Sequence, residues 1–461
     1  MLLTVITASR GAALQVVYEC AVESALLSAF GEYNRELLDR YDVFFIDLSY
    51  LSNSPDPTNL EARLNEYFDD NFHPENGTSF LFYSDILDVT DTNVSLKEYE
   101  IATDRFGEPF ARQVAEYMSN LVGISDVKDM LNTMSVWDSY NLSTSGFDEI
   151  RESTKQKIIN YDTETWEQTH IKERLFTIMY PKSEMIILLG EDFFNLSKEA
   201  IVLEDTLLIR NKQHGTGPVT EFELEPAQKI YFIEYIINKM GSYIDQKEES
   251  KLKYEAEYII IGSDSDFNNI QTYIQMLYVT RALEDYISLN MATDKVDNVR
   301  AVAELLSAFI KIPEPVITQA ILVGWAALEG ITDIHDLIKG ERVPLIKTSS
   351  QINVSLQGLL NQLSGNVEIP EETVDNLGDV ESEIPNITLS YNDYLRIFLY
   401  MIPNIVETYR TMDIVEQNLR KSGTGNEYFR FDVCADKIKA VFAIETGFDF
   451  RYVSEKRYSY F

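Results

Sequence analysis

Apolar residues recur at helical spacing through the first 41 residues of the chain. Steps of three, four or seven residues place them on one face of a helix. The members of this stripe are Ile6, Ala13, Val17, Cys20, Leu27, Phe30, Leu37 and Tyr41. No proline precedes Pro55, so no proline breaks the helix early. We therefore expect one continuous helix over residues 1–42, about 60 Å long at 1.5 Å per residue, followed by a short strand at Val43–Ile46.

The remaining residues, 43–461, mix helix and strand patterns, which predicts an α+β head carried by the long helix as a spine. Residues 264–338 predict a cluster of helices, because apolar residues at helical spacing follow Ser, Thr and Asp residues suited to helix N-termini. From Ile438 to Tyr452, apolar residues alternate with mostly polar ones, which predicts antiparallel C-terminal strands. The stretch Tyr254–Ile261 (YEAEYIII) predicts a further strand that ends at Gly262.

One segment of the head is unusually acidic. Residues 348–395 contain no Lys or Arg, and Glu and Asp crowd the interval around Pro370 and Pro385. Like charges and prolines favour solvated loops. We therefore expect an acidic loop at about 348–388 within the head and no separate domain there.

The net charge of the chain limits the kinds of molecule that it is expected to bind. The formal net charge is −36, so the surface repels nucleic acid and anionic lipid, and basic proteins, cations or neutral surfaces are the expected partners. Before Glu19 the only charged residue is Arg10. This apolar start has two interpretations: the second half of a membrane span whose first half precedes Met1, or a soluble spine that packs its apolar side on the head.

The sequence offers little that points to catalysis. The four histidines have no second ligand at metal-binding spacing, and the motifs of serine hydrolases and nucleotide-binding loops are absent. We therefore expect neither enzymatic activity nor a cofactor. Asp264 and Asp266, with Glu255 or Glu257, are weak candidates for Ca²⁺ or Mg²⁺ ligands. Helix capping by the same aspartates is the favoured alternative, because their oxygens accept free backbone N–H groups.

Four stretches, in the same order over more than 400 residues, resemble one bacterial family. The first is Glu32-Tyr33-Asn34-Arg35-Glu36-Leu37-Leu38 with Tyr41 and Val43–Asp47, and the second is Tyr254–Ile260 with Gly262 and Ser265-Asp266. The others are Val343–Thr348 and Met412–Lys421. The chain resembles an uncharacterised family of Gram-positive bacteria that accompanies tight-adherence (Tad) pilus clusters. The N-terminus of that family is similar to TadE/TadG pseudopilins.

The resemblance implies a protein of the cell envelope. Its N-terminal helix would cross the membrane, its acidic head would lie outside the cell, and its partners would be other Tad-like pilus subunits, contacted through that helix. In the family this anchor extends further upstream than Met1, so we expect the natural parent to carry the rest of the span. The alternative is a surface adhesin or ligand-binding protein with an acidic head, in one version dependent on Ca²⁺. The motif residues with an expected structural role are Glu32, Tyr33, Asn34, Arg35, Tyr254, Glu255, Glu257, Tyr258, Gly262 and Asp266.

Overall fold

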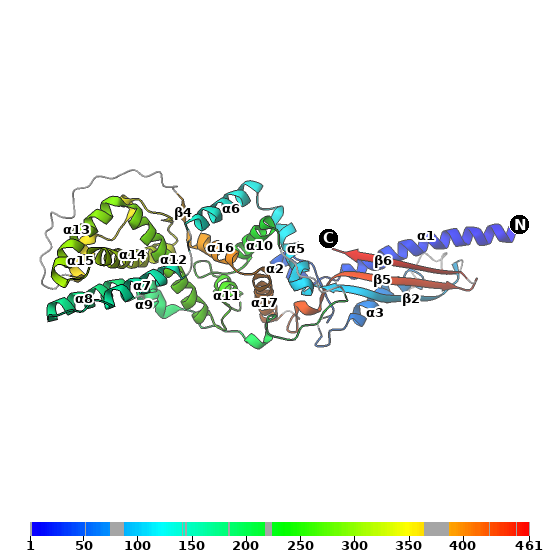
Figure 1. Cartoon of the computed structure of the whole chain (residues 1–461). Coiled ribbons are helices and arrows are strands. Elements are labelled where there is room, and N and C mark those ends of the chain that lie inside the picture. The colour runs from blue at the N-terminus through cyan, green and yellow to red at the C-terminus, as the bar shows by residue number, and fades with distance from the viewer. Residues whose placement is uncertain are drawn as a thin grey trace.

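The computed structural model describes residues 2–460, except for residues 51, 74–86, 141, 143–144, 183–184, 217–223, 364–386, 424 and 449 and the side chains of residues 2–5 and 362–363. The molecule is elongated, with a β-sheet and helix α1 (Leu2–Phe30) at one end and a cluster of helices at the other (Figure 1). The buried apolar residues form two hydrophobic cores, one beneath the sheet and one among the helices. The architecture is therefore α+β, as the sequence predicted.

The sheet is built around β5 (Cys434–Thr446). Strand β2 (Val89–Ile101) runs antiparallel along one edge of β5, and β1 (Ile46–Asp47) and β6 (Arg451–Ser459) pair antiparallel with β5 at its other edge. The hairpin of β5 and β6 confirms the antiparallel C-terminal strands that the alternating pattern predicted.

Helices α1 and α3 (Pro57–Asp69) cover one face of this sheet. The residues of β5 that alternate from Ile438 to Ile444 are buried on that face, because successive strand side chains point to opposite sides. Tyr18 of α1 reaches across and donates a hydrogen bond to the Phe442 carbonyl at 2.8 Å. The second half of α1 is therefore part of the head and shares its core.

The continuous helix expected over residues 1–42 is interrupted. Helix α1 ends at Phe30, and α2 (Arg35–Tyr41) begins after Asn34. The Asn34 side chain accepts a hydrogen bond from the backbone N–H of Leu37 at 3.1 Å. This bond satisfies a free N–H of a new helix, and such local bonding competes with continuing the previous helix. The strand expected at Val43–Ile46 is also displaced, because β1 spans Ile46–Asp47.

The second core is helical. It confirms the predicted cluster at 264–338, which consists of α12 (Asp266–Met291), α13 (Thr293–Ile310) and α14 (Glu314–Ile338). The other helices of this part are α5 (Glu108–Ser119), α6 (Ile124–Ser139), α7 (Gly146–Ile159), α8 (Trp166–Met179), α9 (Met185–Leu189), α10 (Pro226–Lys239), α11 (Glu255–Ile261), α15 (Leu356–Leu363), α16 (Tyr391–Met401) and α17 (Asn404–Ser422).

The strand predicted at Tyr254–Ile261 is wrong, because this stretch is helix α11. Glu255 and Glu257 are both buried. The polar residues of this stretch therefore do not mark a solvent-facing side, which is the feature that separates a helix pattern from a strand pattern. Periodicity does not distinguish a short, fully buried helix from a buried strand. Gly262 ends α11 with a positive φ of 78°, a conformation that glycine adopts without strain.

The acidic loop expected at about 348–388 is only partly a loop. Its first part contains helix α15, and its end contains β4 (Thr388–Leu389), which pairs with β3 (Val343–Pro344). The apolar residues Leu356, Leu359 and Leu360 are buried in the helical core, which holds α15 in place. Residues 364–386 lie outside the described residues.

Candidate functional site

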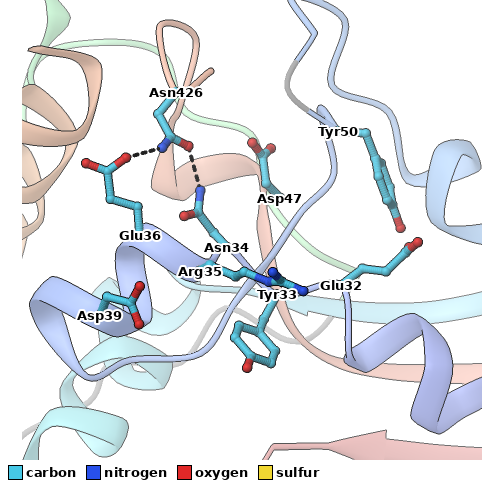
Figure 2. A pocket seen from close by; sticks show the side chains of 9 residues that line it. All are labelled: Glu32, Tyr33, Asn34, Arg35, Glu36, Asp39, Asp47, Tyr50 and Asn426. Atoms are coloured by element: carbon cyan, nitrogen blue, oxygen red, sulfur yellow. Dashed lines mark hydrogen bonds between the residues drawn. The ribbon is translucent and has the colours of Figure 1, made fainter. Parts of the chain in front are cut away.

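A cavity of about 570 Å³ lies where the α1–α2 connection meets α2, β1 and the segment between α17 and β5. Its lining includes four residues of the first resembling stretch, Glu32, Tyr33, Asn34 and Arg35. Figure 2 shows the side chains that line it. They are Glu32, Tyr33, Asn34, Arg35, Glu36, Asp39, Asp47, Tyr50 and Asn426.

Hydrogen bonds hold one wall of this cavity together. Asn34 Nδ2 donates to Asn426 Oδ1 at 2.7 Å, and Asn426 Nδ2 donates to Glu36 Oε2 at 2.7 Å (Figure 2). Asn34 also caps α2 through its side-chain oxygen. The first turn of α2 is thereby fixed to a segment that follows it by almost 400 residues, so the cavity is assembled by the tertiary fold.

Two of the lining carboxylates are already paired with cations. Glu32 accepts hydrogen bonds from Arg63 of α3 and from the Tyr67 hydroxyl at 2.6 Å. Glu36 forms an ion pair with Arg40, one turn later in α2, at 3.2 Å. These pairs fix the two glutamates and neutralise most of their charge.

Three other charged side chains of the cavity lack an ion-pair partner within the described part of the chain. Asp47, the last residue of β1, is only 7% exposed, and its Oδ1 accepts a hydrogen bond from the Ser49 N–H at 2.8 Å. Burial raises the pKa of the Asp47 carboxyl, because a low dielectric disfavours the charged form. Asp39 and Arg35 are exposed at the rim.

Aromatic rings complete the lining. The Tyr33 ring packs edge-on against Phe44 with a centroid distance of 5.4 Å. Tyr50 has a positive φ of 47°, an uncommon conformation for a residue other than glycine. Its hydroxyl is buried, and burial together with the neighbouring Glu32 carboxylate raises the pKa of this hydroxyl. Carboxylates beside aromatic rings form a surface that favours organic cations.

The four weak candidates for metal ligands are held by other contacts in the described part of the chain. Glu255 accepts from the Gly241 N–H at 2.5 Å and from Asn418 at 2.6 Å, and Glu257 accepts from the Tyr243 N–H at 2.9 Å and the Tyr391 hydroxyl at 2.6 Å. Within the described ranges, no group of three or more His, Cys, Asp or Glu side chains is placed to hold a metal ion. The two glutamates lie inside the core because α11 is a buried helix, and each binds protein donors.

The two aspartates behave as helix-terminus residues. Asp264 is exposed and accepts from the Asn268 side chain at 3.0 Å. Asp266 is buried and accepts from the backbone N–H groups of Lys253 and Tyr254, at 2.9 and 3.1 Å. The N–H groups that Asp266 binds lie at the start of α11, although Asp266 itself belongs to α12. Neither aspartate caps α12, which has no side-chain cap hydrogen bond, so the capping that the sequence favoured is replaced by a bond to the segment before α11.

The remaining motif residues form buried contacts within the helical core. The Tyr258 hydroxyl lies 3.4 Å from Asp413 Oδ2, and Asn418 donates to the Tyr41 hydroxyl at 3.0 Å as well as to Glu255. Gly262 lies against the Arg410 guanidinium. Three of the four resembling stretches therefore meet in one polar network around α11 and α17.

Sequence reasoning did not single out Asp39, Tyr50 or Asn426. Asn426 follows a glycine-rich turn and carries no local signal of a role, because its partners Asn34 and Glu36 are remote in the chain. Asp47 was visible as the end of the first resembling stretch, but its burial was not. A polar residue at the end of an apolar strand was the one available signal.

Comparison with known proteins gives one match. Nothing among the curated proteins or the solved structures matches the chain. A family model described as a family of unknown function (DUF5702) matches residues 166–446, more than half of the 461 residues. The match runs from α8 to the end of β5 and includes Asn426, whereas the other residues that line the cavity precede it. The chain therefore belongs to the DUF5702 family of unknown function.

Proposed function

We propose that this protein is a non-enzymatic structural or assembly component of a Tad-like pilus or secretion apparatus at the cell envelope. Helix α1 holds it at the membrane and packs against neighbouring subunits, and the acidic head lies outside the cell. The resemblance of the N-terminal residues suggested this role, and the packing of α1 supports it.

The observation that carries the proposal is a second apolar face on α1. One face, which includes Leu14, Tyr18 and Val22, is buried on the sheet and α3. On the outer side, Ile6, Val16 and Leu27 are 47%, 65% and 60% exposed. Ala13 and Cys20 are exposed between them. A helix that is apolar on both sides requires cover on both.

The spacing of this outer face fits a helical partner. Ile6, Ala13, Cys20 and Leu27 are seven residues apart, the repeat that brings two packed helices into register. The small residues Ala13 and Cys20 lie between the larger Ile6 and Leu27, which permits close approach of a second helix at the middle of the stripe. We therefore assign the outer stripe of α1, defined as Ile6, Ala13, Val16, Cys20 and Leu27, to packing between subunits.

The start of α1 supports the membrane part of the proposal. The stretch Ile6–Phe30 is long and apolar enough to cross a membrane by length and composition. Figure 1 shows the first part of α1 projecting beyond the sheet. The part that precedes the contacts of Arg10 and Gly11 with Phe448 and Tyr452, Leu2–Ser9, would fill about 12 Å at 1.5 Å per residue of a hydrocarbon core about 30 Å thick. The other apolar stretch, Glu314–Ile338, is two-thirds buried in the helical core.

Cysteine cross-linking tests the subunit contact. Cys20 is exposed and Cys434 is buried, so Cys20 is the thiol available for oxidation. We expect copper-phenanthroline to produce a covalent dimer of the full chain, through Cys20 if the helices are in register. If they are offset by one heptad, Ala13→Cys pairs with Cys20 instead.

Matched variants decide the result. Val16→Glu and Leu27→Glu are expected to suppress the cross-link, whereas Leu121→Glu, at a residue 62% exposed elsewhere on the molecule, is expected to leave it unchanged. The proposal fails if neither cysteine arrangement cross-links while maleimide still labels Cys20. It also fails if the outer-stripe variants cross-link as well as the wild type.

A surface ligand-binding role is the second candidate, and the cavity in Figure 2 favours it. It requires no subunit contact through α1. If a Val16→Glu/Leu27→Glu variant binds its surface ligand as well as the wild type does, this role is favoured over assembly.

A further inference from the structure

We propose that the cavity lined by Asp47, Tyr33 and Tyr50 binds a basic side chain, a lysine ammonium or an arginine guanidinium, presented by a partner polypeptide, with Asp47 as its counter-ion. This inference does not rest on the proposed function, because it concerns a separate surface of the protein and holds whether or not α1 packs on another subunit.

Asp47 is the observation that carries the proposal. It is a carboxylate with 7% exposure that lines an open cavity. One of its oxygens accepts the Ser49 N–H, the Ser49 side chain lies beside the carboxylate, and no Lys or Arg among the described residues pairs with it. A buried carboxylate normally has a cation or several donors, because burial without a partner costs free energy. A cation that enters the cavity would supply the missing partner.

The neighbouring side chains select an organic cation. Tyr33 and Tyr50 present aromatic surface, which attracts ammonium and guanidinium groups. The Tyr50 hydroxyl is buried beside the Glu32 carboxylate, and its oxygen can accept a hydrogen bond from a bound ammonium or guanidinium group. Asp39 adds negative charge at the rim and has no ion pair among the described residues.

The size and charge of the site indicate a side chain carried by a protein. About 570 Å³ accommodates a side chain with its flanking backbone. An inorganic cation is disfavoured, because the described residues offer no cluster of three ligands. The net charge of −36 draws basic partners towards the molecule and accelerates their encounter.

Arg35 repels a bound ammonium or guanidinium group. Its removal should therefore change the affinity in the opposite direction to removal of Asp47. It lines the same cavity, is exposed, and forms no ion pair or hydrogen bond with the described residues. Its positive charge competes with an incoming cation for the field of Asp47 and Asp39. Removing this charge should therefore strengthen binding.

Calorimetric titration of the full chain measures the effect. The probes are acetyl-Gly-Arg-Gly-amide and acetyl-Gly-Lys-Gly-amide, with acetyl-Gly-norleucine-Gly-amide as the uncharged blank. We expect saturable one-to-one binding of the charged peptides only, and the tighter of the two names the preferred group. Asp47→Asn should weaken binding tenfold or more, since removal of a buried charge partner has a large effect.

The controls separate a site from general attraction. Asp91→Asn changes the net charge equally at an exposed residue of β2 and should leave affinity unchanged. Arg35→Gln should raise affinity severalfold, and Tyr33→Ala should lower it without changing the charge. If Asp47→Asn does not fold, Asp39→Asn at the exposed rim and Arg35→Gln decide.

The outcomes that overturn the proposal are distinct. Absence of saturable binding, equal weakening by Asp47→Asn and Asp91→Asn, or weaker binding by Arg35→Gln would each refute a cation site here. None of these results bears on cross-linking through α1, so the two proposals stand or fall separately.

Discussion

Lys347 lies in a buried ion network, and its replacement by methionine is the most informative test of the helical core. Its Nζ lies 2.6 Å from Glu329, 2.7 Å from Asp333 and 3.2 Å from Asp285, and the side chain is 1% exposed. Arg281 of α12 contacts the same two aspartates and is also buried. Methionine keeps the length of the side chain and removes the charge.

The magnitude follows from what the substitution leaves behind. Asp333 and Asp285 keep Arg281 as a partner. Glu329 keeps only the backbone N–H groups of Asn353 and Val354, both at 2.8 Å. Removing one member of a buried ion pair costs about 3–5 kcal/mol, because the charge that remains is uncompensated. We expect Lys347→Met to lower the free energy of unfolding by this amount at pH 8.

Urea unfolding followed by tryptophan fluorescence is the assay. Trp325 and Trp137 are buried in the same core, and Trp137 donates to Glu284 of the network at 3.2 Å. The penalty should shrink at pH 5, because burial raises the pKa of the Asp285 carboxyl and Lys347 opposes that rise, so loss of Lys347 lets this carboxyl take up a proton. Lys311→Met removes a pair with Glu164 in which both side chains are well exposed, and it should cost far less, because solvent screens such a pair. A loss at Lys347 no larger than at Lys311, or one independent of pH, would refute the reasoning.

Three further predictions concern pH, backbone and calcium. Burial raises the pKa of Glu257 to about 7 and the pKa of Glu407 and Asp413 to about 8. The folded state therefore holds these protons more tightly than the unfolded chain does. The free energy of unfolding should fall as pH rises from about 4.5 towards 8. Glu257→Gln should remove up to about 3 kcal/mol of this fall in urea titrations, and an unchanged pH slope would contradict it. Gly262 and Gly423 both have positive φ, so replacing either by alanine strains the backbone, and Gly423→Ala should cost about 1–2 kcal/mol. Gly262→Ala should destabilise the protein at least twice as much, because a Cβ at Gly262 collides with Arg410 whereas the space beside Gly423 is open. Equal shifts in Tm for the two variants would argue against the Arg410 contact. Millimolar Ca²⁺ should leave the Tm unchanged, because the described residues present no cluster of three ligands; a rise in Tm would support the calcium-dependent adhesin.

The sequence predicted correctly those elements whose pattern of apolar and polar residues fits either a helix or a strand, but not both. The helices of 264–338 have clear apolar faces and polar caps, and the C-terminal hairpin alternates around a glycine turn. Tyr254–Ile261 was mispredicted because its glutamates are buried, which removes the polar face on which pattern analysis depends. The break at Asn34 was missed because a capping residue resembles any polar residue on a helix surface.

The cavity was beyond reach of sequence analysis for a different reason. Glu32 to Arg35 were marked by resemblance, and nothing in their pattern indicated that Asn426 completes their wall. Long-range pairing of this kind is set by the packing of two cores and leaves no periodic trace. The burial of Asp47 similarly depends on its place at the end of β1, beside β5.

The sheet joins the two ends of the chain, and this sets an order of folding. The Tyr452 hydroxyl donates to the Gly11 carbonyl at 3.0 Å, Lys456 pairs with Glu19 at 2.7 Å, and the Tyr460 hydroxyl donates to the Phe30 carbonyl at 2.9 Å. The surface that receives α1 therefore does not exist until the last strands have left the ribosome. Helix α1 is therefore made long before the strands that cover it and docks only after them. Until then its sheet-facing apolar residues lack their final neighbours, and such exposed apolar surface favours aggregation.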